Sequence, residues 1–421
     1  MTMRRATIGL VVVAGFAMGF GPVGNVEGVV EPAVVEPIAP HDRPVIQLAL
    51  LLDTSNSMDG LIDQARASLW AVVRELSAAT HDGVAPELQV ALIEYGNNGI
   101  SRDAGYVRLR TNFTSDLDLL SEQLFGLVTN GGDEWCGRAI AEAMGTLRWW
   151  GDALSEGSGS SSLGEAALEA LCEGLEGGVP KVIEVDGPVV RLLVIAGNEP
   201  FDQGATPYQS SIATARAMGV TVNTVHCGGR DEGLSTGWHD GARLGGGLFA
   251  NIDSDRRVVE PATPFDAELS ELNTKLNATY LPYGARGGVY VGRQLRQDAL
   301  NDSAGFGAGR AASKAAPAYR QAHWDLVDAM EDGTVELSKL DDEDLPESLR
   351  GLGIEAQRAK IDAVRADRTR VQEAILAVTA KRDGFLAEWR ERHAQGPDTL
   401  NDALIAALRE QVVERGYAFE E

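Results

Sequence analysis

Apolar and polar residues follow two alternating patterns along the first two thirds of the chain. Short, mainly apolar runs recur, and stretches in which apolar residues return every three or four positions lie between them. The runs predict buried strands and the stretches predict amphipathic helices. Strands alternating with helices at this spacing predict an α/β fold with a doubly wound, mainly parallel sheet. The expected strands are 45–52, 88–95, 106–113, 189–196, 220–225 and 245–252, and the expected helices are 61–76, 117–127, 138–150 and 210–218.

The pattern changes at about Asp266, after which it predicts helices and no further strands. A heptad-like seam runs through residues 361–389, with Arg368 and Arg382 at two of its positions. It favours an antiparallel helical hairpin or small bundle over a long free coiled coil, and a last helix is expected at 400–413. The seam residues are Ile361, Val364, Val371, Ile375, Val378, Phe385 and Trp389.

Three segments are expected to lie outside the packed elements. Residues 1–24 combine a basic start with an apolar run, which predicts a signal peptide or an uncleaved N-terminal anchor. Residues 25–43 are rich in Val and Pro and predict a linker, and the Gly/Ser-containing segment at about 151–187 predicts a surface insertion. The remaining chain divides into an α/β domain at 44–276 and a helical region at 277–421. We therefore expect an extracytoplasmic protein, held at a membrane only if the N-terminal segment remains uncleaved.

The charge balance excludes two classes of partner. The chain has 62 acidic and 37 basic residues, a net charge of −25. Binding a nucleic-acid backbone needs a surplus of Lys and Arg, so a nucleic acid is not expected as partner. The same balance argues against docking on an anionic lipid surface.

The segment Asp53-Thr54-Ser55-Asn56-Ser57 follows the apolar run Leu48–Leu52 directly. One carboxylate and two hydroxyls at alternate positions form a cluster of hard oxygen ligands, which suits Mg²⁺ or Mn²⁺. The loop leaves a buried strand, where open α/β sheets place their ligands. The alternative is that these Asp and Ser residues cap the following helix. From these residues alone, both interpretations stay open.

No catalytic motif is complete. The serines of Gly157-Ser158-Gly159-Ser160 lack the strand-to-helix turn that exposes a nucleophile. Adjacent residues on a strand point to opposite faces, so His226 cannot activate Cys227 simply, and His239 would have to approach that thiol in space. We therefore expect a protein that is not an enzyme.

The sequence resembles a von Willebrand factor type A domain over roughly residues 44–276. The resemblance rests on the apolar strand with its Asp-Thr-Ser-Asn-Ser loop, on Gly131-Gly132-Asp133, and on the strand ending in Gly197-Asn198-Glu199. The whole chain also resembles exported bacterial proteins that carry this domain with a helical C-terminal region. The segments that resemble theirs are TNGGDEWCG, AGNEPF and NATYLPYG.

The resemblance implies a metal-ion-dependent adhesion site that holds one divalent cation, Mg²⁺ or Mn²⁺. Asp53, Ser55 and Ser57 match its first loop without gaps. In such a site, an Asp or Glu carboxylate from a protein partner completes the coordination of the metal.

The other two loops depart from the family pattern. The second loop usually supplies a Thr; here Thr129 precedes the glycines, and Asp133 is the expected substitute ligand. The third loop usually presents an Asp, but Gly197 stands there, so Asn198 or Glu199 must substitute. Loss of an anionic ligand weakens the hold on a divalent ion.

The function that these features predict is an exported, non-enzymatic protein-interaction module with a divalent cation at its sheet rim. The alternative is a metal-independent structural scaffold whose helical region carries the contacts, including self-association. With the family topology, Cys136 and Cys227 lie at one rim of the sheet, where they form either a disulfide or two free buried thiols. Cys172, in the insertion, is expected to be a solitary thiol.

Overall fold

A six-stranded sheet forms the centre of the computed structural model, which describes residues 43–56, 58–150, 188–252, 261–392 and 400–419. The strand order is β4-β3-β1-β5-β6-β7, and all neighbours pair in parallel except β4, which runs antiparallel at one edge. This arrangement confirms the predicted doubly wound, mainly parallel sheet. The strands are β1 (Val45–Asp53), β3 (Glu87–Tyr95), β4 (Val107–Thr114), β5 (Val189–Gly197), β6 (Thr221–Cys227) and β7 (Gly246–Ile252). Ser57, Cys172, the insertion and the N-terminal segments expected at 1–24 and 25–43 lie outside the described residues, apart from Arg43.

The central strand β1 shows why the sheet is parallel and buried. All nine of its residues are buried, because helices cover both faces and parallel strands of this kind carry continuous apolar runs. Its side chains alternate between two cores: Leu50 belongs to one face and Leu51 to the other. The edge strand β4 is half exposed and carries Arg108 and Arg110, as expected for a strand with one unpaired side.

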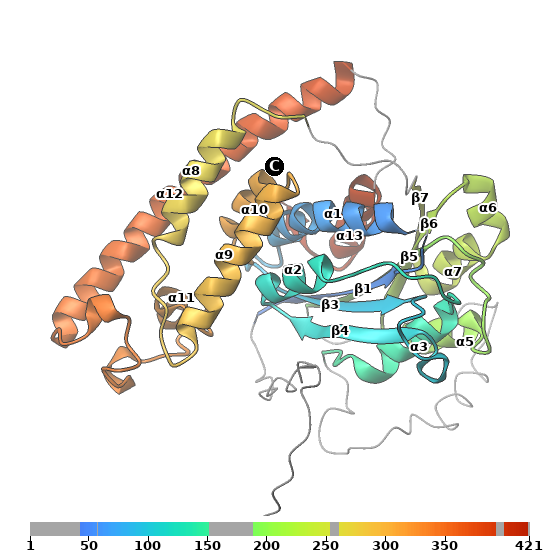
Figure 1. Ribbon diagram of the computed structural model, residues 1–421, viewed down its shortest axis with the longest axis horizontal. Helices are drawn as coiled ribbons and strands as arrows, with labels where there is room; N and C mark the ends of the chain where they lie inside the picture. The colour runs from blue at the N-terminus through green and yellow to red at the C-terminus, as the bar shows by residue number, and fades with distance from the viewer. Residues whose placement is uncertain (1–42, 57, 151–187, 253–260, 393–399, 420–421) are drawn as a thin grey trace, which may run out of the picture. The chain divides into compact units, whose positions relative to one another are not determined.

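Helices cover both faces of the sheet (Figure 1). One face packs against α1 and α13 and the other against α3 and α5, in agreement with the two cores. The helices of this part are α1 (Asp59–Ser77), α2 (Leu117–Phe125), α3 (Cys136–Thr146), α5 (Tyr208–Ala217), α6 (Arg230–Ser235) and α7 (Trp238–Gly245), with a 3₁₀ turn at Arg102–Ala104.

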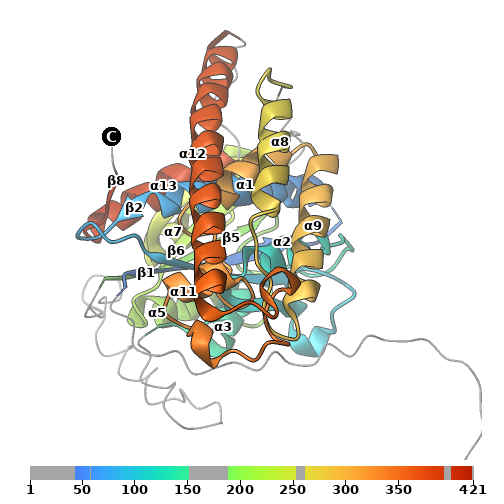
Figure 2. The same cartoon turned by 90° about the vertical axis from the view of Figure 1, so that its left-hand side faces the viewer.

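The helical region follows β7, and α8 and α12 lie side by side in both views (Figures 1 and 2). Within the described ranges, none of the helices has the length and the apolar composition needed to cross a membrane. The helices are α8 (Asp266–Asn277), α9 (Gly287–Ser303), α10 (Gly307–Lys314), α11 (Leu326–Glu331), α12 (Ile354–Arg392) and α13 (Leu400–Glu414), with 3₁₀ turns at Leu337–Lys339 and Glu347–Leu349.

The expected heptad-like seam lies on one continuous helix, α12, which packs against α8. Ile361 and Ile375 are fully buried on this seam. The two arginines that interrupt the seam are also buried, and each meets a carboxylate: Arg368 Nη1 lies 2.7 Å from Asp325 Oδ2, and Arg382 Nε lies 2.9 Å from Asp266 Oδ1. The arginines therefore belong to the packing of α12 against α8 and α11.

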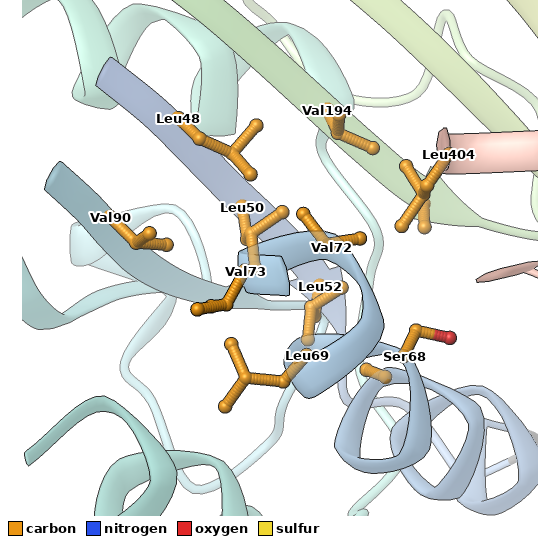
Figure 3. Close-up of a pocket in the computed structure, with 12 residues that line it drawn as sticks. Leu48, Leu50, Leu52, Ser68, Leu69, Val72, Val73, Val90, Val194 and Leu404 are labelled. Atoms are coloured by element: carbon orange, nitrogen blue, oxygen red, sulfur yellow. The ribbon is translucent and has the colours of Figure 1, made fainter. Parts of the chain in front are cut away.

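The C-terminal helix α13 returns to the sheet and packs against α1. Leu404 of α13 faces a small apolar pocket that is otherwise lined by β1, α1, β3 and β5 (Figure 3). Further along α13, the Gln411 and Asn223 side chains exchange hydrogen bonds. The described residues from Arg43 onward accordingly belong to one compact unit.

The expectation of no strand after Asp266 is wrong at the very end of the described chain. Strand β8 (Ala418–Phe419) pairs antiparallel with β2 (Ala79–Thr80), which follows α1. Because α13 packs along α1, the residues that follow it reach the end of α1 and meet the backbone there. Two residues are too few to give a periodic signal in the sequence.

Candidate metal centre

The carboxyl ends of three neighbouring strands define the candidate site. Asp53 ends β1, and its register partner Tyr95 ends β3. On the other side of β1, Gly197 ends β5, one residue beyond the last paired position. The chain leaves β1 towards β3 on one side and returns to β5 on the other, so this is the switch point at which open α/β sheets bind ligands. Asp53 therefore lies where a ligand is expected.

Helix capping does not explain the Asp53 loop. Helix α1 begins at Asp59, its capping residue is Met58, and no side chain caps it. The Oδ1 atom of Asp53 instead accepts a hydrogen bond from the backbone N–H of Ser55, at 2.7 Å. The Asp53 carboxylate thus accepts a hydrogen bond from the backbone of its own loop. The capping alternative does not account for Asp53 or Ser55.

Two buried oxygen atoms in this loop make no direct hydrogen bond of good geometry among the described residues, although the Asp53, Ser55 and Glu134 side chains interact with one another. They are Oδ2 of Asp53 and Oγ of Ser55. Asp53 is fully buried and Ser55 is 3% exposed. Burying a carboxylate without a partner is unfavourable by several kcal/mol, so a charge of this kind calls for a proton or a cation. Both atoms are hard oxygen donors of the type that Mg²⁺ and Mn²⁺ prefer.

A second carboxylate, that of Glu134, lies beside Asp53. Glu134 is 4% exposed, and its Oε2 accepts a hydrogen bond from the backbone N–H of Glu199 at 3.3 Å. Burial raises the pKa of Asp53 well above its usual range, and the charge of Glu134 raises it further. Burial also raises the pKa of Glu134. Two carboxylates in one buried place favour binding of a positive charge.

The adjacent Asp133, which the sequence suggested as ligand, is exposed. Sequence reasoning missed Glu134 because neighbouring side chains in a loop have no fixed alternation, so the motif Asp133-Glu134 does not show which of them points inward. The only available signal was that two carboxylates stand together after the glycines. Whether Asp133 takes part in binding stays a prediction.

Glycine 96 makes the approach of these carboxylates possible. It has a φ of +76°, in the left-handed region that favours glycine. A Cβ atom at this position would lie 2.7 Å from Asp53 Oδ1 and 2.9 Å from Glu134 Cγ. The absence of a side chain at Gly96 therefore leaves room for both acidic side chains.

Backbone hydrogen bonds hold the surrounding loops together. The N–H of Thr54 donates to Tyr95 O at 2.8 Å, and the N–H of Asn130 donates to Thr54 O at 2.9 Å. The buried amide of Asn97 donates to Val128 O at 2.9 Å, and Asn56 Oδ1 accepts from the N–H of Gly131 at 2.7 Å. The first loop is thus fixed to the two loops beside it.

The remaining predicted site residues lie around this centre in less buried positions. Thr129 Oγ1 donates to Asp59 Oδ1, at 2.5 Å, so its hydroxyl is engaged away from Asp53. Asn198 is half-buried, and its carbonyl oxygen lies 3.2 Å from Nε2 of the buried His226. Glu199 is exposed. The structure brings Asp53, Ser55 and Glu134 together, and places Thr129 and Glu199 at the margin.

Gly197 stands at the position that carries an Asp in the family pattern. A Cβ here would lie 2.3 Å from Tyr95 Oη and 3.1 Å from Asp53 Oδ2. The Tyr95 hydroxyl is held in place because it donates to Ala196 O at 2.9 Å. Tyr95 therefore occupies the space of a side chain at this position, and glycine is required.

The two described cysteines are free thiols, so the disulfide that we considered is not formed. Cys136 begins α3 in the core on one face of the sheet, whereas Cys227 ends β6 in the core on the other face. The Cys227 side chain points from β6 to the face opposite to the one that α3 covers, which is why a shared rim did not bring the thiols together. His239 packs against Phe249, with 5.7 Å between ring centroids, on the face opposite to Cys227. A Cys–His pair is therefore not assembled.

The donor chemistry of the centre fits a hard divalent cation. It combines two carboxylates with a hydroxyl, and contains no sulfur or imidazole ligand among its described members. Within the described residues, no group of three or more His, Cys, Asp and Glu side chains is arranged to hold a metal ion. Any cation here would consequently rely on hydroxyl, backbone or water oxygens as well, as Mg²⁺ commonly does.

No protein-family model and no curated protein matches the chain. Among solved structures, it is similar to a mussel byssus thread matrix protein with a zinc-occupied MIDAS motif, at 10% identity and a TM-score of 0.33 over 51% of this chain and 43% of that one. It is also similar to a von Willebrand factor type A protein from Catenulispora acidiphila, at 12% identity and a TM-score of 0.31 over 50% and 39% of the two chains. A third similar structure is a manganese-loaded TRAP protein from Plasmodium vivax, at 13% identity and a TM-score of 0.29 over 50% and 70%.

The chain spans less than half the length of the first two of these structures. Von Willebrand A domains are among the similar structures, as the sequence motifs led us to expect. All three TM-scores are below 0.5, so these structures carry no argument about function, which is argued from the side chains of the centre.

Proposed function

We propose that this protein is an exported, non-enzymatic interaction module that binds one divalent cation, Mg²⁺ or Mn²⁺, at the rim of its sheet. The ligands are Asp53, Ser55 and Ser57 of the first loop and an acidic side chain of the second loop, for which the sequence suggested Asp133. An Asp or Glu carboxylate of a protein partner completes the coordination.

One observation supports this proposal above the others. The Asp53 carboxylate and the Ser55 hydroxyl are buried at the switch point of the sheet beside Glu134, and an oxygen of each makes no hydrogen bond of good geometry among the described residues. Neither serves as a helix cap. A bound cation would satisfy both atoms and balance the buried charge.

The rim around the centre suits the approach of an acidic partner. Asn56 and Asn130 are exposed beside it, and Val128 is 73% exposed. These groups are neutral, and a bound cation would supply the positive charge that attracts an incoming carboxylate past the exposed carboxylates of Asp133 and Glu199. A metal ion inverts the local electrostatics even within a protein of net charge −25.

A metal-independent scaffold is the second candidate, and the packing of the helical region favours it. The long helix α12 buries one seam against α8 and leaves the remaining faces largely exposed along its 39 residues. In that case the exposed faces of α12 would contact the partners, including a second copy of the chain, and the loops at the sheet rim would bind no metal.

Calorimetric titration of Mg²⁺ and of Mn²⁺ into the full chain separates these two candidates. We expect saturable binding for the wild type and none for Asp53→Ala. Asp82→Asn is the control, since this side chain is 94% exposed in a turn after β2 and Asn tolerates the left-handed φ of +51° at this position. No binding by the wild type, or equal binding by Asp53→Ala, would overturn the metal proposal. Pull-downs in Mg²⁺ and in chelator then test the partner, and cell fractionation tests export.

A further inference from the structure

We infer that Glu134 is the second carboxylate ligand of the cation, and that Tyr95 closes the third-loop position beside Gly197. The chain would then hold its cation between two buried carboxylates, Asp53 and Glu134. This inference rests on the proposed function and goes beyond it, because it assigns a ligand that neither the motif nor its resemblance supplies.

Burial distinguishes Glu134 from its neighbour. Glu134 is 4% exposed, whereas Asp133 is exposed to solvent. Two hydrogen bonds fix Glu134: its N–H donates to Gln203 Oε1 at 3.3 Å, and its Oε2 accepts from the N–H of Glu199 at 3.3 Å. A carboxylate accepts several bonds, so this contact positions Glu134 and leaves capacity for a metal ion. Asp133 would have to turn inward to reach the same place.

The backbone around the centre brings both carboxylates to one point. Asp53 Oδ1 and Glu134 Cγ lie 2.7 Å and 2.9 Å from the position of a Cβ at Gly96. Gly96 has no side chain at that position, and its positive φ favours glycine there. The two side chains also interact directly with each other, so one cation at this point would lie between both carboxylates.

Tyr95 explains why the third loop of this site, at Gly197, differs from the family pattern. Its hydroxyl lies 2.3 Å from the position of a Cβ at Gly197, so a side chain at 197 cannot enter unless Tyr95 moves. The third loop thus adds no carboxylate from this position. Glu134 compensates, because it restores the negative charge from the second loop.

Two carboxylates balance the charge of a divalent cation within the chain itself. Metal binding should therefore not depend on the partner, and the isolated protein should bind Mn²⁺. A site with one carboxylate would gain more from the partner's acidic group and would bind the free ion more weakly.

Mn²⁺ binding to the full chain, followed by electron paramagnetic resonance with Mg²⁺ as competitor, tests this assignment. Glu134→Gln keeps the size of the side chain and removes its charge, and Asp133→Asn makes the same change one residue earlier. Losing even an outer-sphere partner weakens metal binding about 10–100-fold, so we expect at least about a tenfold weaker affinity for Glu134→Gln. Asp133→Asn should stay within about twofold of the wild type, as expected for an exposed group outside the coordination sphere.

The outcomes separate the inference from the proposed function. If Asp133→Asn weakens binding and Glu134→Gln does not, the Glu134 assignment is wrong while the metal site stands. If the wild type binds no Mn²⁺, both are wrong, and the two carboxylates instead share a proton. Thermal melting of each variant shows whether it is folded. Should Glu134→Gln fail to fold, Glu134→Asp keeps the charge on a shorter side chain and should also weaken binding, and unchanged affinity would overturn the inference.

Discussion

Asp118 on α2 and Arg310 on α10 form a buried ion pair with 2.8 Å between Oδ1 and Nη2, although 192 residues separate them in the chain. Arg310 also meets Asp298 of α9, whose other oxygen lies 2.9 Å from Lys314 Nζ. The four charged side chains are at most 8% exposed. Through them, a helix of the α/β part and two helices of the C-terminal region share one buried charge cluster.

Replacing Arg310 should destabilise the whole protein. Arg310→Met leaves Asp118 and Asp298 with too little compensating charge, and breaking a buried ion pair in this way costs about 3–5 kcal/mol. Urea unfolding measures the change. Arg296→Met is the control, because Arg296 is 61% exposed and lies 3.9 Å from its carboxylate partner, so it should change stability by less than about 1 kcal/mol. Equal effects of the two substitutions would show that the buried cluster contributes no stability.

The same cluster predicts a loss of stability in acid. Burial would raise the pKa of Asp298, but Arg310 and Lys314 lower that pKa to about 2. An unfolded Asp has a pKa of about 3.9. The folded value is the lower one, so Asp298 contributes stability above about pH 4 and loses it as the pH falls towards 2.

Unfolding free energies at pH 6 and pH 3 check this expectation. The wild type should lose stability on acidification, and Asp298→Asn should lose less, since the variant has no carboxylate to protonate at this position. The stability difference between the two proteins should therefore shrink at pH 3. A constant difference would show that Asp298 titrates alike in the folded and unfolded chain.

The last helix should be needed for the stability of the sheet. Leu408 of α13 is 1% exposed in the core that α13 shares with α1 and β1, so Leu408→Ala should cost about 2–5 kcal/mol. Val413 on the same helix is 50% exposed, and Val413→Ala should change stability by no more than about 0.5 kcal/mol. Chemical denaturation of both variants compares them. If Leu408→Ala left the unfolding transition unchanged, α13 would not belong to the cooperative unit.

The contact between Gly197 and Tyr95 can be tested by a double-mutant cycle. Gly197→Ala puts a methyl group against the Tyr95 hydroxyl, and overpacking of this kind costs about 1–3 kcal/mol. Tyr95→Phe removes the hydroxyl together with its hydrogen bond to Ala196, at a cost of about 1 kcal/mol. The double variant should be more stable than the sum of the two losses implies, with a coupling of about 0.5–3 kcal/mol. Simple additivity would show that the hydroxyl does not fill this space.

The thiols of Cys136 and Cys227 should resist modification in the native protein. Burial raises the pKa of each thiol well above its usual range, and both side chains are buried, at 1% and 4% exposed. In a Cys172→Ser variant, iodoacetamide should label neither residue before denaturation and both after it, as measured by mass spectrometry. Two labels in the denatured, unreduced protein also test the absence of a disulfide. A protein that accepts label only after reduction would contradict the structure.

Much of the α/β fold could be predicted from the sequence because its central strands are buried on both faces. The predicted strands 45–52, 88–95 and 189–196 differ from β1, β3 and β5 by a single residue at one end. Continuous apolar runs of this kind depend on local composition alone. The place of Asp53 at the carboxyl end of β1 followed from the same signal.

Contacts between distant segments could not be predicted in this way. The sequence of α10, Gly307–Lys314, has the polar character of a solvated helix, yet Arg310 and Lys314 are fully buried, because their counter-charges come from α2 and α9. The return of α13 to the sheet depends on packing that no local period encodes. The inward turn of Glu134 is set by backbone contacts to other loops. Each of these features is a tertiary effect, and tertiary context overrides local preference.

The position of Tyr417 has a consequence for the order in which the protein can form. Its hydroxyl donates to Pro188 O at 2.7 Å, and its neighbours pair with the strand that follows α1. During synthesis, the first strands and α1 emerge long before the helix that covers them. Until the chain has been made up to these residues, the apolar surface beneath α13 has no cover, and exposed surface of this kind promotes aggregation. A nascent chain therefore leaves this apolar surface exposed until the residues of α13 and Tyr417 have been synthesised.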